Sequence, residues 1–126
     1  MTIEAKTLEA AFDSLIFAPS RTPESDDLDS AFCELSSYRD GAIFLGHWAG
    51  HSEWEIHRNG DEIVMVIEGS TTLTMLIDGI EIPHTLKPGQ LIVVPQSTWH
   101  RFETPEEVKI MTVTPQPTEH SVERPE

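Results

Sequence analysis

The sequence predicts an all-β domain, and three features of its middle region support this prediction. Turn-forming pairs divide the region into short segments: Asp40-Gly41, Asn59-Gly60, Asp78-Gly79 and Pro88-Gly89. The segments between them are rich in Val, Ile, Thr, Phe and Trp, which are typical of strands. Asp78-Gly79 joins two alternating runs, a pattern that predicts a tight hairpin. Many short strands with turns between them are typical of a sandwich or barrel.

The expected elements follow from these segments in chain order. Leu8, Ala11, Phe12 and Leu15 have helical spacing, so a short helix, or else an extended segment, is expected within residues 8–17. Residues 19–30 are polar, acidic and contain proline, which predicts a loop. Strands are expected near residues 42–48, 53–57, 62–68, 71–77, 80–85, 91–95, 99–103 and 108–114.

The length of 126 residues predicts one domain, 1–126, with a core large enough to need no disulfides. We expect the barrel at about 32–114, after an acidic N-terminal segment 1–31 and before a Pro-rich acidic tail 115–126 that is extended or frayed. The single cysteine, Cys33, excludes an internal disulfide framework and a Cys-rich zinc module.

The net charge of −14 argues against two classes of partner. Nucleic acid and anionic membrane surfaces both select cationic patches, so neither is expected to bind. Residues 1–30 and 103–126 carry −9 of this charge, so most of it lies at the chain ends. With no basic leader followed by an apolar stretch at the N-terminus, we expect a cytoplasmic protein.

The segment Ile63–Ile67 is apolar at every position, whereas a strand with one wet face should alternate. We therefore expect both of its faces to be covered. A second sheet, the N-terminal segment or another subunit would provide the cover, and the last alternative predicts a homodimer.

Several polar residues are expected to meet at one end of the barrel. Glu53, Glu55 and His57 share a face of one strand, and Glu62 follows across the Asn59-Gly60 turn. His100 shares a strand face with Phe102. If the sheet curls into a small barrel, His57, Glu62 and His100 would converge as a two-histidine, one-carboxylate metal site, with Glu55 as a fourth ligand.

The order of these residues also carries a family resemblance. His57, Glu62 and Gly69 have the spacing H-x4-E-x6-G, and Gly89, Pro95 and His100 the spacing G-x5-P-x4-H. In this order and one hairpin apart, the stretches resemble the cupin motifs G-x5-H-x-H-x3,4-E-x6-G and G-x5-P-x-G-x2-H-x3-N. The resemblance covers about residues 40–114 and implies a small antiparallel jelly-roll (cupin) β-barrel, as in small single-domain bacterial cupins.

The chain departs from the cupin motifs at four positions. Glu55 replaces the first histidine, Ala49 the leading glycine, Ser97 a glycine and Thr104 the asparagine. Cupin sites usually hold three histidines and one glutamate, so the Glu55 replacement makes the ligand set harder and favours Fe(II) or Mn(II). Glu55 would alternatively point away from the metal or hydrogen-bond locally.

The resemblance implies one divalent metal ion (Fe, Mn, Ni or Zn) bound by His57, Glu62, His100 and Glu55. It predicts a metal-dependent enzyme of oxygenase or isomerase type acting on a small organic molecule, with Glu55 or Glu53 as general base when free of metal. The alternatives are a non-catalytic small-molecule binding or sensing domain and a purely structural metal site. Phe102, Trp48 and Trp99 are expected either to line the pocket or to pack in the core.

Overall fold

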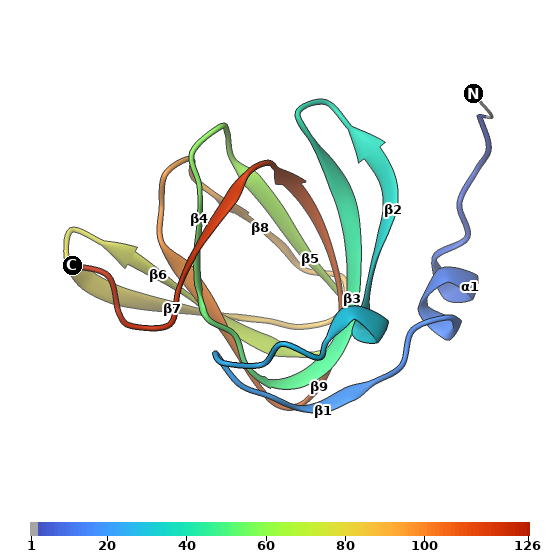
Figure 1. The fold of residues 1–126 in the computed structure, drawn as a ribbon, viewed down its shortest axis with the longest axis horizontal. Helices are drawn as coiled ribbons and strands as arrows, with labels where there is room; N and C mark the ends of the chain where they lie inside the picture. Colours follow the sequence, from blue (N-terminus) through green and yellow to red (C-terminus); the bar gives the residue numbers. More distant parts are fainter. Residues whose placement is uncertain (1–2) are drawn as a thin grey trace.

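The computed structural model describes residues 3–126, and its strands form one sheet that curls around an interior without closing into a ring (Figure 1). The all-β prediction and the jelly-roll architecture are confirmed. The elements are α1 (Leu8–Asp13), β1 (Ala18–Arg21), η1 (Asp29–Ala31), β2 (Phe32–Tyr38), β3 (Gly41–His51), β4 (Trp54–His57), β5 (Glu62–Gly69), β6 (Thr71–Ile77), β7 (Ile80–Leu86), β8 (Leu91–Val94), β9 (His100–Pro115) and β10 (Thr118–Ser121).

Strand β9 connects the two halves of the curled sheet. Its residues 100–103 pair with β6 and its residues 108–113 pair with β5, while β3 lies along its other edge. The sequence predicted two strands here, near residues 99–103 and 108–114, on either side of Pro105. The proline is tolerated because it lies at the bend, where the β3–β9 register shifts between Trp48 and Gly50.

Alternation along the strands directs one set of side chains inward. On β5, Glu62, Val64 and Val66 are buried, and on β9 the buried set includes His100, Phe102 and Ile110. The apolar members pack into one core: Trp48, Val64, Val66, Leu73, Met75, Leu86, Val94, Phe102, Val108 and Ile110. The polar members at the end of this core form the site described below.

The outward face of β5 is covered at only one end. The helix α1 packs against β3, and its buried Phe12 lines a small cavity together with Ile67 of β5. At the other end, Ile63 remains 39% exposed. The N-terminal segment therefore provides part of the cover that the sequence predicted for this strand.

Both chain ends contribute strands that the sequence did not predict. Residues 19–30 were expected to form a loop, but β1 pairs in parallel with β3 through Ala18↔Trp48 and Arg21↔Gly50. In the tail, β10 pairs with β4, and Figure 1 shows it running across the front of the curled sheet. Within residues 3–126, no helix is long and apolar enough to cross a membrane.

Candidate metal centre

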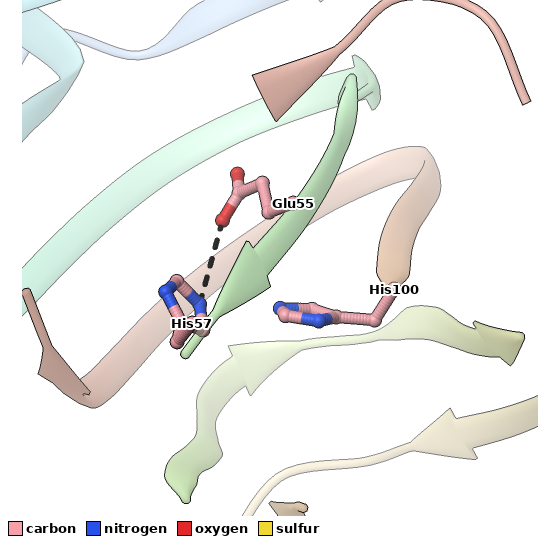
Figure 2. Close-up of side chains that lie close together, drawn as sticks. All are labelled: Glu55, His57 and His100. Carbon is pink, nitrogen blue, oxygen red and sulfur yellow. Dashed lines mark ion pairs between the residues drawn. The ribbon is translucent and has the colours of Figure 1, made fainter. Parts of the chain in front are cut away.

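Four predicted site residues come from three strands that meet at one end of the interior. Glu55 and His57 share a face of β4, and the β4–β9 register sets Glu55 opposite His100. Figure 2 shows these three side chains directed toward one another. Glu62 begins β5 immediately after the turn that follows β4, so its carboxylate enters the same space. The geometry therefore brings together His57, Glu62, His100 and Glu55.

Three of these side chains meet at a single buried point. The Glu62 Oε1 atom lies 3.0 Å from His100 Nε2 and 3.3 Å from His57 Nε2. The three side chains are 0–4% exposed. Burying two imidazoles and a carboxylate is unfavourable unless each is hydrogen-bonded or coordinates a cation.

Neighbouring groups fix the orientation of each ligand side chain. The His100 Nδ1–H donates to the Thr98 carbonyl at 2.9 Å, and His57 Nδ1 hydrogen-bonds with the Thr118 hydroxyl at 2.9 Å. The Thr114 hydroxyl donates to Glu62 Oε2 at 2.6 Å. These bonds occupy the outer atom of each group and direct the inner atoms, two Nε2 and one Oε1, toward each other. Such outer partners are the usual support of metal-binding imidazoles and carboxylates.

The three inner atoms have no hydrogen-bond partner among the described residues. Because a carbonyl can only accept, the proton of neutral His100 must be on Nδ1, which leaves a lone pair on Nε2. That lone pair faces the Glu62 oxygen at 3.0 Å, an arrangement that needs a cation or a proton between the two atoms. The donor set of two imidazole nitrogens and carboxylate oxygens fits Fe(II), Mn(II), Ni(II) or Zn(II).

Titration in the metal-free protein reflects the same arrangement. Burial alone would raise the pKa of Glu62, but the contacts with His100 and His57 outweigh it and lower this pKa to about 2. Burial alone would lower the pKa of His100, but the Glu62 and Glu55 carboxylates outweigh it and raise this pKa above its ordinary value. Both shifts favour a charged Glu62 carboxylate facing the His100 imidazole.

Glu55 lies beside this point but forms a hydrogen bond with neither His57 nor Arg21. Its Oε2 is 4.0 Å from His57 Nε2, and its Oε1 is 3.9 Å from the Arg21 guanidinium. Glu55, His57 and His100 each offer a ligand atom within 4.8 Å of the others. Both roles predicted for Glu55, fourth ligand or free carboxylate, are compatible with this position.

A cavity of about 430 Å³ opens from the cluster toward solvent. Its size is ordinary for a small-molecule site. Phe102 and Trp48 line it, as expected, but Trp99 is outside the lining. Trp99 directly precedes His100, and neighbouring residues of an extended chain face opposite sides.

The cavity wall also contains residues that the sequence analysis did not single out: Arg21, Phe32, Phe44, Ile110, Thr112, Thr114, Gln116, Thr118 and His120. Alternation along β9 could have indicated the three even-numbered residues 110, 112 and 114, which share the His100 face. No comparable signal pointed to Arg21 or Thr118, which come from β1 and β10. His120 pairs with Glu53 at 3.6 Å at the rim of the cavity.

Comparison with known proteins agrees with this architecture. The cupin domain family matches residues 47–114, more than half of the chain, and the chain belongs to the cupin family. No protein with a curated description matches the sequence significantly.

Solved structures with a similar fold include a cupin-2 domain containing protein and two enzymes. A cupin-2 domain containing protein from Shewanella frigidimarina NCIMB 400 is 27% identical, with 68% of this chain and 79% of that chain covered and a TM-score of 0.58. Hydroquinone 1,2-dioxygenase PnpCD in complex with Cd2+ and 4-hydroxybenzonitrile is 16% identical over 67% of this chain and 63% of its own (TM-score 0.57). Oxalate oxidase is 18% identical over 56% and 39% (TM-score 0.51). This chain thus spans less than two thirds of either enzyme.

Proposed function

We propose that this cupin binds one divalent metal ion through His57, His100 and Glu62 and uses it to act on a small organic molecule. The observation that carries the proposal is the convergence of three buried inner atoms that have no hydrogen-bond partner within residues 3–126. Each is oriented from behind by Thr118, Thr98 or Thr114. A structural role for such unpaired groups would be costly, because each loses its hydration without compensation.

In this proposal, the residues around the metal have distinct tasks. A metal at this point would polarise a substrate oxygen or activate dioxygen, which are the chemistries of isomerase- and oxygenase-type cupins. Glu55 is the fourth ligand or, when free, the general base, because it borders both the cluster and the cavity. The apolar side chains Trp48 and Phe102 exclude water from the inner end of the cavity. The neighbouring dioxygenase and oxidase folds are compatible with oxidative chemistry at this site.

Metal analysis of the tag-free protein tests the proposal. We expect about one metal ion per chain in the wild type and loss of that metal in the His57→Ala and His100→Ala variants. His84→Ala is the matched control, because His84 lies in β7 outside the cavity. A wild type that binds no metal, or binds it equally in all variants, would contradict the proposal.

The alternative is a binding or sensing cupin without catalysis. It is favoured by Glu55, which stands where most cupins have a histidine and is 4.0 Å from His57. A metal-loaded wild type that binds small ligands but shows no turnover of them under air would support this alternative.

We also propose that the chain forms a homodimer through the outward face of β5 and β8. Ile63, Leu91 and Val93 are 39%, 57% and 46% exposed, and the β5–β8 register joins them into one patch through Ile63↔Val93 and Met65↔Leu91. A contiguous apolar patch on such an acidic protein is typical of an interface. Sedimentation analysis should give a dimer for the wild type and a monomer for Val93→Lys; a monomeric wild type would refute this assembly.

A further inference from the structure

Arg21 is a mostly buried cation in the wall of the cavity. Its side chain is 11% exposed, and its guanidinium carbon lies 4.6 Å from the Trp48 ring centre and 5.2 Å from that of Phe32. These two rings hold the planar group by cation–π contact. The charge is therefore fixed in position on an aromatic wall.

The backbone that carries Arg21 is also held tightly. Arg21 pairs with Gly50, whose φ of +114° is accessible mainly to glycine. A Cβ at Gly50 would lie 2.1 Å from the Arg21 carbonyl oxygen, so only glycine permits this close approach. The close packing of the short strand β1 against β3 therefore holds the Arg21 backbone at a defined position beside the cavity.

The Arg21 guanidinium has N–H donors that are not used in hydrogen bonds with the described residues. No hydrogen bond from this group is formed within residues 3–126, and its nearest carboxylate, Glu55, is beyond hydrogen-bond distance at 3.9 Å. Burial lowers the pKa of Arg21 and the Glu55 and Glu53 charges partly offset this, but a guanidinium stays protonated at neutral pH. An arginine whose N–H groups are unused and face a cavity is suited to bind an anion by donating hydrogen bonds to it.

The charge balance of the cavity also favours an anionic ligand. Arg21 is its one cationic wall residue among those described, against the two carboxylates Glu55 and Glu62. A divalent metal on the cluster would offset both of these wall carboxylates and leave Arg21 as the remaining charge of the cavity wall. The loaded cavity would then carry a net charge of about +1, which one singly charged anion neutralises.

We propose that Arg21 is a specificity-determining residue that binds a carboxylate group of the ligand, so that this site selects small monocarboxylic acids with an apolar body. This inference rests on the proposed metal centre for its charge balance. The flat guanidinium matches the two oxygens of a carboxylate. Phe32, Phe44 and Trp48 provide the surface on which the apolar part of the ligand packs.

A different role for Arg21, as a fixed counterion of Glu55 alone, makes a different prediction. In that case removing the arginine would change metal affinity but would treat charged and neutral ligands alike. The preference for a carboxylate over its matched amide therefore separates the two roles.

Calorimetric titration of the full chain, with and without Mn(II), tests the proposal with two pairs of probes: benzoate with benzamide, and phenylacetate with phenylacetamide. In the metal-loaded wild type we expect at least one carboxylate to bind about tenfold or more tightly than its amide. Arg21→Met, which keeps an apolar stem between the rings, should remove this preference. Arg21→Lys should retain part of this preference, because lysine keeps the positive charge but lacks the planar group that donates two parallel hydrogen bonds to a carboxylate.

Arg39→Gln is the control, because it removes the same charge from an exposed position between β2 and β3. It should leave the preference unchanged, and circular dichroism should show all variants folded. Equal binding of acid and amide by the wild type, no binding of either acid, or an undiminished preference in Arg21→Met would each overturn the proposal.

The two parts of the experiment keep this inference separate from the metal proposal. Metal uptake without carboxylate preference would overturn the role of Arg21 and leave the metal centre standing. An Arg21-dependent preference in a chain that takes up none of Fe(II), Mn(II), Ni(II) and Zn(II) would support carboxylate recognition and refute the metal centre.

Discussion

The hydrogen bond between Thr118 and His57 gives the sharpest prediction about the metal centre. The Thr118 hydroxyl meets His57 Nδ1 at 2.9 Å and is the side chain that holds this ring from behind. Thr118→Val replaces the hydroxyl with a methyl group of similar size. It leaves Nδ1 unpaired and the imidazole free to rotate, while the ligand atoms themselves are retained.

Loss of such an outer partner typically costs 10–100-fold in metal affinity, or about 1.4–2.8 kcal/mol. Competition with a metal-selective chelator measures this directly. Thr72→Val is the matched control, because Thr72 pairs with Thr85 between β6 and β7, away from the site. If Thr118→Val binds metal within about twofold of the wild type, as the control should, the hydrogen bond does not orient a ligand and this reasoning fails.

Three further predictions follow from the site. Metal retention should fall with decreasing pH, starting above the ordinary imidazole pKa of 6.5, because protons on His100 compete with the metal; pH-independent retention would contradict this. In the metal-free protein, the lowered pKa of Glu62 contributes folding stability that is fully present above pH 4.5 and is lost as the pH falls toward 2. Urea unfolding should therefore show a shallower loss of stability over this pH range for Glu62→Gln than for the wild type. Gly46→Ala should cost about 1–3 kcal/mol of unfolding free energy and displace Phe32 from the cavity, since the added Cβ would lie 2.7 Å from that ring; an unchanged thermal midpoint would contradict the packing.

The inner half of the site was predictable because it depends on local rules. Alternation along a strand sets Glu55 and His57 on one face, and the Asn59-Gly60 turn returns the chain so that Glu62 starts the next strand beside them. The second motif supplied His100 from β9. Glu55, His57 and Glu62 are close in sequence, so their spacing places them together, whereas His100 was assigned to the site through the resemblance to the second cupin motif.

The outer half of the site depends on pairings between distant segments, which spacing does not encode. Arg21 lies in a Ser- and Pro-containing stretch typical of a loop, and only its parallel pairing with β3 makes it a strand. Thr118 lies in a Pro-rich tail, where only pairing with β4 sets it opposite His57. Four-residue strands of this kind have no periodicity of their own to detect.

The negative charge of the chain has two roles in this account. Most of it lies at the chain ends, where acidic side chains would also bind divalent cations weakly and without a fixed geometry. Glu62 and Glu55 differ because they are directed into the interior beside the imidazoles of His57 and His100. Stoichiometry alone would not distinguish these sources, but the position of the bound ion would.

Anomalous diffraction from crystals grown with Mn(II) tests the central claim most directly. The account predicts one strong anomalous peak within coordination distance of His57 Nε2, His100 Nε2 and Glu62 Oε1. A map with no peak at this point, or with peaks only among the acidic residues at the chain ends, would contradict it.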